Sequence, residues 1–590
     1  MSIKSTYSTR IEEYRSLSSE YRAKVRNSNI MRGIVFLAGI AGAIVAVNYS
    51  LSAMWIILTV SLVAFLFFIK KNSEFIQLKN YYDAMLKINE NELKSINGDN
   101  SAFHGGDEYI DKSHNFSYDL DIFGSNSIFQ KINRTVTGGG RSILAGKFMN
   151  PSTDISEILE IQQNSKLFVD ELDARQNFMA EGMMNGNVPS ADYTKNITAD
   201  KYHFTNSPIW MIVAILLTAC TLGAIVLSYM DIVSPYCGIL LYMVQMVIFG
   251  INSGKTSALY KKIGHYSKLI KKYGKLFEII EKIPAKPQKF SQINDNRISR
   301  ALGGLAKISA MYEHRHNLMI MIFGQGIICY DIFLNIRYEK WLREYSGQSA
   351  EWFHIVHEYD FLFSLANLKY NNPDYCYPTP VEEKFVLEAG NAGHPLINPG
   401  KCVRNDIGFS NCNFLTILTG ANMAGKSTYL RTIGVNLILA MAGAPVCASS
   451  MRFAPVSMIT SIRTSDSVQD SESYFFAELK RLRKIVERLE SGDTIFIIVD
   501  EMLRGTNSKD KHDGSKKFIE KLLKYNCYGI FATHDIDIGN MQDTYPENVN
   551  AKCFEISFEG GQLIFDYKIK AGISKNLNAS YLMKKMGIID

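Results

Sequence analysis

The sequence predicts a C-terminal α/β domain preceded by an all-helical region that carries two pairs of membrane-spanning helices. A glycine-rich motif at Gly420–Ser427 lies between a strand pattern and a helix pattern, and a continuous apolar run at Thr494–Val499 is typical of a buried parallel strand. Four long apolar runs lie in the first 251 residues. At 590 residues the chain is too long for one core, and ~150 residues per domain predicts three or four units.

A phosphate-binding loop is predicted at Gly420–Ser427, which follows the pattern Gly-xxxx-Gly-Lys-Ser. The apolar strand Phe414–Leu418 leads into it, and the helical run Thr428–Ala442 follows it. Glycines let the backbone turn tightly, so that N–H groups converge on phosphate oxygens at a helix N-terminus. The sequence therefore predicts an α/β P-loop domain that binds ATP.

The side chains of this motif predict how ATP and Mg²⁺ are held. We expect Lys426 to reach the β- and γ-phosphates and the Ser427 hydroxyl to ligate Mg²⁺. The expected ATP-binding residues are Gly420, Ala421, Asn422, Met423, Ala424, Gly425, Lys426, Ser427, Thr428 and, from a later loop, Ser473.

Two carboxylates close the apolar run Thr494–Val499. Asp500 and Glu501 are expected beside the phosphate-binding loop, with Asp500 holding Mg²⁺ directly or through water and Glu501 orienting or deprotonating the attacking water. A second strand pattern, Tyr528–Asp535, contains His534, which at the ligand edge of the sheet can sense the γ-phosphate. The expected catalytic residues are Glu501, His534 and Lys426.

A polar loop at Asp466–Ser473 opens a helical pattern that runs to Leu489. Ser473 and the adjacent N–H groups would lie at the helix N-terminus, where an anion is favoured. This places a second potential phosphate contact in the domain.

Two closely spaced pairs of apolar runs predict two membrane hairpins, because a span needs ~20 apolar residues. Buried core helices are the alternative, but the runs lack the polar face of a globular helix. Small residues at Ala38, Gly42 and Ala46 would allow close helix packing. The runs are Gly33–Val47, Leu51–Ile69, Pro208–Tyr229 and Ile232–Ile251.

Charge predicts the orientation of these hairpins. Basic residues flank both pairs, whereas the short connecting turns hold only Asp231. By the positive-inside rule both termini and the ATP-binding domain are expected in the cytoplasm.

Nine cysteines without a C-x-x-C pair indicate reduced thiols, and a net charge of +6 argues neither for nor against nucleic acid.

Two further segments have competing interpretations. The basic face at Lys261–Lys282 would meet anionic lipid head groups or DNA phosphates, and its position directly after a span favours lipid. Leu318–Ile336 is apolar, but Gln325, Asp331 and Asn335 interrupt it, so we expect a core helix rather than a fifth span.

Several motifs resemble the MutS mismatch-repair ATPases, relatives of the ABC-type ATPases. Residues 129–172 resemble the start of the MutS helical core, and 377–590 resemble its ATPase domain more closely. The matching positions are Gly393–Leu396, the phosphate-binding loop with Asn422 and Met423, Ser473–Phe475, Asp500 and Glu501 with Arg504–Thr506, Thr533 and His534, and Gly572 with the tract Asn576–Gly587.

The resemblance implies a homodimer in which Ser473 of one subunit completes the ATP site of the other, and it is the only indication of DNA binding. Ala421 and Ala424 depart from the usual proline and glycine, and Leu503 stands where the family commonly has glycine. No segment resembles the family's mismatch-reading domain, its DNA clamp or its C-terminal dimerisation helices.

The domain organisation expected from these observations follows the chain. We expect a cytoplasmic helix at 1–30, a transmembrane hairpin at 31–71, a helix and loop linker at 72–120, MutS-like helical core at 121–207, a second transmembrane hairpin at 208–252, the second part of the core at 253–376 and the ATPase domain at 377–590.

The main hypothesis is a membrane-anchored, dimeric MutS-like ATPase whose helical core moves with the nucleotide cycle and binds DNA in mismatch repair or DNA-structure sensing. The alternative is a nucleotide-driven switch that organises the membrane through a lipid or a protein partner, which the sequence does not identify. An ABC transporter is disfavoured because the loop before Glu478 lacks a Ser-Gly-Gly-Gln sequence.

Overall fold

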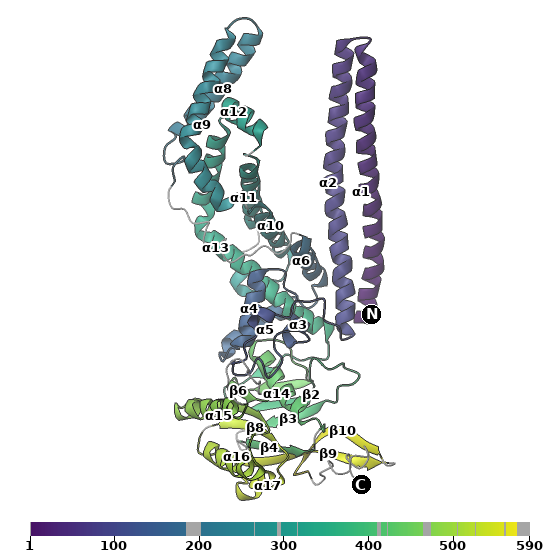
Figure 1. The fold of residues 1–590 in the computed structure, drawn as a ribbon, viewed down its shortest axis with the longest axis vertical. Helices are drawn as coiled ribbons and strands as arrows, with labels where there is room; N and C mark the ends of the chain where they lie inside the picture. The colour runs from purple at the N-terminus through teal and green to yellow at the C-terminus, as the bar shows by residue number, and fades with distance from the viewer. Residues whose placement is uncertain are drawn as a thin grey trace. The chain divides into compact units, whose positions relative to one another are not determined.

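The computed structural model describes residues 2–184, 202–264, 266–291, 297–315, 317–409, 415–421, 423–463, 474–503, 505–525, 527–559 and 562–574. The chain folds into two compact units (Figure 1). Unit 1 comprises Met1–Glu90, Thr135–Arg141 and Glu171–Phe361, and unit 2 comprises Asn91–Arg134, Ser142–Asp170 and Leu362–Asp590. An all-helical N-terminal region and a C-terminal α/β region, as expected, are present.

The first hairpin consists of two continuous helices, α1 (Ile3–Val47) and α2 (Leu51–Ile96). They approach closely at Gly39, where a Cβ atom would lie 1.9 Å from the Ser61 Oγ atom. The Ser61 hydroxyl donates to the Val35 carbonyl at 3.0 Å. Of the small residues expected at this contact, Ala46 is buried and a Cβ atom at Gly42 would lie 3.3 Å from the Ile57 side chain, whereas Ala38 is exposed.

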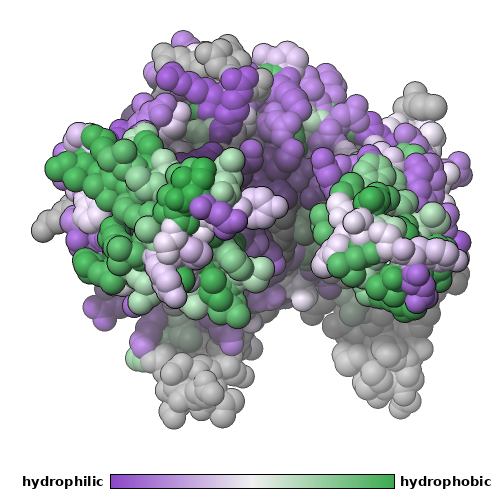
Figure 2. Space-filling model, turned by 90° about the horizontal axis from the view of Figure 1, so that it is seen from above, coloured by the Kyte–Doolittle hydropathy of each residue, from purple (hydrophilic) through white to green (hydrophobic). Residues whose placement is uncertain are grey.

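The second hairpin consists of α8 (Ile209–Tyr229) and α9 (Pro235–Ile263). Together with α1 and α2, these helices are long and apolar enough to cross a membrane, and at most 17% of the apolar window of each is buried. Figure 2 shows hydrophobic residues gathered in two areas of the molecular surface. An outward apolar surface of this kind differs from that of a helix in a globular core.

Unit 1 also contains α6 (Leu172–Met184), α10 (Ser267–Lys282), α11 (Arg297–His314) and most of α13 (Tyr330–Asn371), with the short turn η2 (Gln288–Phe290). The apolar face of α10, with Tyr273 and Phe277, is buried, and α10 packs on α11. The expected basic face is smaller than the sequence suggested, because Lys272 is buried and donates to the Val136 carbonyl at 2.8 Å.

The segment Leu318–Ile336 does not form the single core helix that the sequence suggested. A π-helical turn, η3 (Ile320–Gly324), leads into α12 (Gln325–Ile328), and the chain then bends by 80° into α13. The bend lies at Cys329, whose φ of 46° is left-handed. The prediction of a single core helix was wrong because an apolar composition does not reveal where the backbone breaks.

Unit 2 begins with helical and loop segments. Helix α5 begins after Asp154, whose side chain accepts from the Ser156 N–H group and so caps the helix. The elements before the sheets are η1 (Asp107–Tyr109), α3 (Ile128–Ile132), α4 (Gly138–Met149, whose first residues belong to unit 1) and α5 (Ile155–Lys166).

Unit 2 contains a six-stranded and a four-stranded sheet. The larger has the order β10-β9-β4-β8-β7-β6, in which all neighbours are parallel except β9 and β10. Its strands are β4 (Leu415–Gly420), β6 (Ser457–Ser461), β7 (Ile495–Asp500), β8 (Cys527–Thr533), β9 (Val549–Glu559) and β10 (Gln562–Ala571). The smaller sheet, β1-β5-β2-β3, contains β1 (Thr379–Pro380), β2 (Leu387–Ala392), β3 (Asn405–Phe409) and β5 (Ser450–Phe453).

The central strands β4, β7 and β8 are buried along their whole length, as expected of parallel strands covered on both faces. Leu482 and Ile485 of one flanking helix and Ile519 and Leu522 of another complete a core with the strands. The helices of the α/β region are α14 (Lys426–Met441), α15 (Tyr474–Glu490), α16 (Ser508–Leu522), α17 (Ile536–Gly539) and α18 (Met541–Thr544). The predicted helices and strands are present, with ends shifted by a few residues.

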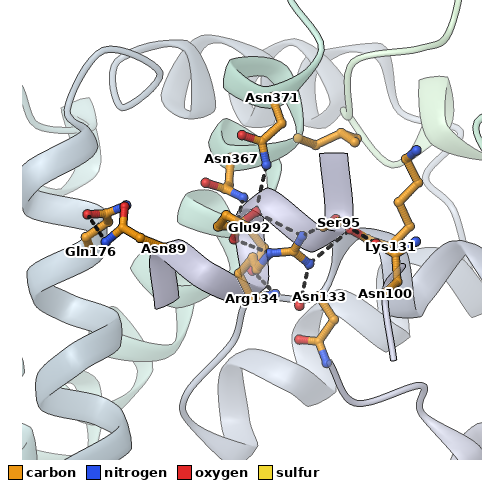
Figure 3. Close-up of polar contacts among 12 residues, drawn as sticks. Asn89, Glu92, Ser95, Asn100, Lys131, Asn133, Arg134, Gln176, Asn367 and Asn371 are labelled. Atoms are coloured by element: carbon orange, nitrogen blue, oxygen red, sulfur yellow. Dashed lines mark hydrogen bonds and ion pairs between the residues drawn. The ribbon is translucent and has the colours of Figure 1, made fainter. Parts of the chain in front are cut away.

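A buried ion pair joins three chain segments of unit 2 (Figure 3). Arg134 donates through Nε and Nη2 to both carboxylate oxygens of Glu92, and the two side chains are 3% and 2% exposed. Asn367 and Asn371, near the end of α13, donate to the same carboxylate at 3.1 and 2.8 Å. The Arg134 guanidinium also lies 3.4 Å from the centre of the Phe103 ring. Glu92 thus satisfies donors from two separate segments.

We expect Glu92→Leu to lower the free energy of unfolding of unit 2 by about 3–5 kcal/mol, because it leaves the buried Arg134 charge without its partner. Pulse proteolysis of the full chain in urea measures this change. The control is Asp493→Leu, which removes the partly exposed Arg488–Asp493 pair and should cost less than about 1 kcal/mol. Equal effects of the two substitutions would contradict the central role of Glu92.

Candidate functional site

The glycine-rich loop, Gly420–Ser427, connects β4 to α14 as predicted. Gly420 has a φ of 147°, and a Cβ atom there would lie 2.8 Å from the Phe554 carbonyl oxygen. Gly425 has a φ of 108°, and its Cβ atom would lie 3.2 Å from the Tyr567 ring. Both positions therefore require glycine, for backbone conformation and for space.

Lys426 is the first residue of α14, and its side chain is buried in the loop. Its ammonium group donates to the Gly420 carbonyl at 2.7 Å and to the Ala421 carbonyl at 3.0 Å. Both ring nitrogens of His534 lie 3.4 Å from the same ammonium. The loop thus concentrates a positive charge at the N-terminus of a helix, where anions are favoured.

Ser427 and Asp500 come from different elements and meet beside Lys426. The Ser427 hydroxyl donates to the Asp500 Oδ2 atom at 2.6 Å, and Asp500 is the last residue of β7. A hydroxyl and a carboxylate oxygen are ligands that Mg²⁺ accepts. The donor set therefore fits the predicted metal.

Glu501 and His534 face each other just beyond the ends of β7 and β8. The Glu501 Oε1 atom forms an ion pair with the His534 Nε2 atom, and Lys511 Nζ lies 3.9 Å from Glu501 Oε2. Glu501 has a φ of 57°, and its N–H group donates to the Ala532 carbonyl at 2.9 Å. A left-handed residue at the strand end turns the carboxylate out of the sheet toward the loop.

A cavity of about 670 Å³ opens over these side chains. Its polar wall contains Lys426, Ser427, Asp500 and Glu501. The opposite wall was not predicted, because its residues come from β3, β9, β10 and the loop before β3 and match no short motif. Those residues include Ile397, Lys401, Val403, Asn405, Phe554 and Tyr567.

The other loop residues differ in their exposure. Met423 is 81% exposed with a φ of 65°, whereas Ala424 is buried. Ala421 and Thr428 line the cavity. Asn422, Ser473, Arg504 and the tract Asn576–Gly587 lie outside the described residues.

Leu503 departs from the family sequence at a position whose backbone favours glycine. Its φ is 58°, which costs free energy for a residue with a side chain. The buried Glu478 carboxylate accepts from the Leu503 N–H group at 2.6 Å. Leu503 also packs in the core beside α16, so burial and this hydrogen bond offset the strain.

His394, in the motif Gly393–Leu396, is buried and is not among the residues that line the cavity. Burial, together with the charges of the nearby Arg431 and Lys131, lowers the pKa of His394 to about 4. Its Nδ1 atom accepts from the Leu396 N–H group at 3.3 Å. A neutral imidazole with this bond has a structural role in shaping the loop.

Comparison with known proteins gives one family. Residues 416–587 match the family model described as MutS domain V. The DNA mismatch repair protein MutS of Ehrlichia chaffeensis is 29% identical over 286 residues, which are 48% of this chain and 33% of that protein. The protein of the same name from Thermotoga maritima is 29% identical over 231 residues, 38% of this chain and 29% of that protein.

A human relative, MutS protein homolog 4, is 30% identical over 233 residues, which are 37% of this chain and 24% of that protein. The chain therefore spans a third or less of the length of these three relatives. The domain match covers the glycine-rich loop and the strands that carry Asp500, Glu501 and His534. Residues 416–587 of the chain therefore belong to the MutS domain V family.

Proposed function

We propose that this protein is a membrane-anchored ATPase that binds MgATP in the cavity over the glycine-rich loop. The observation that carries the proposal is the convergence of Lys426, Ser427, Asp500 and Glu501 at one cavity, with His534 in contact with both Lys426 and Glu501. Three of these side chains lie beside the N-terminus of α14, and two lie beyond the ends of parallel strands, where ligands bind in open α/β sheets.

The phosphates of ATP are held by the loop N–H groups and Lys426. The carbonyl contacts of Lys426 aim its ammonium group along the loop, where it meets the β- and γ-phosphates. The apolar side chains Ile397, Val403, Phe554 and Tyr567 offer a surface for the nucleobase. Mg²⁺ would be held by Ser427 and Asp500 and would neutralise charge on the phosphates.

Glu501 acts as the group that orients and deprotonates the attacking water, and His534 holds the Glu501 carboxylate in place while facing Lys426. The family resemblance adds a homodimer in which Ser473 of one subunit completes the site of the other. ATP binding and hydrolysis then move the helical regions at 121–207 and 253–376, which the hairpins at 31–71 and 208–252 tether to the membrane. The basic flanks of the hairpins support a cytoplasmic location for the ATPase domain, 377–590.

DNA is the partner proposed from the family, and one groove of unit 1 offers a place for an anionic partner. A groove of about 690 Å³ between α10 and α11 is lined by glycine and alanine together with basic residues. Lys275 and Lys282 pair with Glu278, at 2.8 and 3.0 Å. The other basic residues at this groove are Lys268, Lys271, Arg300 and Lys307.

The alternative function is a nucleotide-driven switch that organises the membrane without DNA, and the same groove favours it. The first turn of α10 follows α9, a candidate span, after only three residues. Lysines so close to a span meet anionic head groups readily. The two functions share the ATPase cycle and differ in the anion that binds.

We expect Glu501→Gln to lower ATP turnover by about 100-fold or more, because it removes a general base, while ATP binding remains. Phosphate release and fluorescent-nucleotide binding by the full-length protein in nanodiscs measure both. The matched control is Glu490→Gln, a partly exposed carboxylate that pairs with Lys521 and should leave turnover unchanged. Full ATP turnover by the Glu501→Gln variant would contradict the proposed role of Glu501.

Asp500→Asn and Ser427→Ala should each raise the Mg²⁺ concentration for half-maximal turnover at least about tenfold, because each weakens an oxygen ligand. A Mg²⁺ titration of turnover at saturating ATP measures the shift. Asp493→Asn, on the surface after α15, serves as the control. An unchanged Mg²⁺ requirement in both variants would exclude these residues as ligands.

Lys268→Ala combined with Lys271→Ala should reduce the salt dependence of duplex DNA binding, with the slope of log K against log salt falling by about 0.9 for each lost phosphate contact. Lys516→Ala with Lys517→Ala, on the exposed face of α16, is the control. If the groove variant instead weakens binding to vesicles that contain phosphatidylserine and leaves DNA binding unchanged, the membrane switch is favoured.

A further inference from the structure

The broken segment between α11 and α13 carries apolar side chains on its surface. Leu318 and Met319 are 63% and 61% exposed, and Phe323 is 52% exposed. Met321 and Ile328 are exposed as well. Asn317 precedes this segment and Asp331 follows it, and its helical part, η3 with α12, runs from Ile320 to Ile328.

This segment packs against the second hairpin, in the same unit. Gly326 of α12 lies against α9, where a Cβ atom would come within 1.9 Å of the Tyr242 ring. Cys329 and Ile332 share a buried cluster with Ala214 of α8. Figure 1 shows α12 beside α8 and α9, in agreement with these contacts.

Gln245 of α9 satisfies the backbone groups that the break leaves open. Its Oε1 atom accepts from the Cys329 N–H group at 3.2 Å, and its Nε2 atom lies 3.3 Å from the Ile327 carbonyl oxygen, to which it donates. The same amide donates to the Thr221 hydroxyl at 2.6 Å. Gln245 is 1% exposed. Non-helical backbone is tolerated inside a bilayer only where protein groups satisfy it in this way.

The contacts of Gln245 also set the depth of the break. Its amide bonds to Leu217 and Thr221, which flank the middle of the 21-residue helix α8. If α8 spans the membrane, the break at Ile327–Cys329 therefore lies near the bilayer midplane. Arg315 and Asp331 form a charged pair whose side chains are 7% and 4% exposed. Arg315 also donates to the hydroxyl groups of Ser253 and Ser257 in α9, at 3.2 Å each. Ser253 is about 12 Å along α9 from Gln245, toward the predicted cytoplasmic end.

We propose that residues Leu318–Cys329 form a re-entrant membrane segment, docked on the α8–α9 hairpin, whose exposed side chains contact lipid acyl chains. The proposal rests on the proposed membrane anchoring. Lipid is the partner because this segment packs against α8 and α9, whose own apolar side chains are exposed along candidate membrane spans. The chain enters and leaves the bilayer from one side, so the predicted orientation of the ATPase domain is kept.

Quenching by brominated lipid tests the depth. Full-length protein is placed in nanodiscs of phosphatidylcholine brominated near the middle of its acyl chains, and the fluorescence added by one new tryptophan is measured against the parent chain. We expect Phe323→Trp to be quenched to within about twofold of Ile212→Trp in α8, because both side chains lie inside the ~30 Å hydrocarbon layer. Lys509→Trp, exposed on α16, should not be quenched.

The two tryptophan variants, Phe323→Trp and Ile212→Trp, distinguish failure of the re-entrant segment from failure of the membrane anchoring. Quenching of Ile212→Trp without quenching of Phe323→Trp would overturn the re-entrant segment, whether water or a second copy of the chain covers that face. Absence of quenching at both positions would overturn the membrane anchoring itself.

A second variant tests whether Gln245 holds the break. Gln245→Leu should raise the rate at which N-ethylmaleimide labels the buried Cys329 by about 5- to 100-fold, because the Cys329 N–H group loses its acceptor. Site-resolved mass spectrometry measures the rate, with the exposed Cys237 as internal reference. Thr59→Val, a polar-to-apolar change in α2, should leave it unchanged. An unchanged rate in Gln245→Leu would overturn this docking.

Discussion

The candidate site depends on the parallel pairing of β4, β8 and β7. This register aligns Thr419 with Thr533 and Asp500 with Ala532, so the three strands end at one edge of the sheet. The loop after β4 then places Lys426 and Ser427 within hydrogen-bond distance of side chains that are more than 70 residues away in sequence. A slip of one residue would turn each strand side chain to the other face and separate the pairs.

Buried charges recur where helices of this protein end or break. Glu92 and Arg134 satisfy each other and the amides of α13 in unit 2, and Arg315 and Asp331 do so at the bend in unit 1. Removal of one partner from such a pair is costly, although an apolar replacement of the whole pair can be neutral. These pairs therefore constrain which segments can meet. Helix α13 contributes Asp331 to one pair and, through Asn367 and Asn371, two hydrogen-bond donors to the other.

The strained residues of the site have a common arrangement. Met423, Glu501 and Leu503 all adopt left-handed conformations, and they lie in the two turns that border the cavity. Strain of this kind persists where the surroundings hold it, as the Ala532 carbonyl does for Glu501 and the Glu478 carboxylate does for Leu503. The turns are thus held by neighbouring strands and helices rather than by local preference.

The sequence by itself determined the secondary structure around the loop, the four apolar helices and the family, because each depends on local pattern. Motif spacing also predicted that Lys426, Ser427, Asp500, Glu501 and His534 would lie together. Only the tertiary structure decided that Phe554 and Tyr567 line the same cavity and that Gln245 satisfies the break at Cys329. These contacts join residues that are far apart in the chain. Residues that satisfy a buried polar group or line a cavity wall need not follow any periodic pattern in the sequence, so the sequence alone does not reveal them.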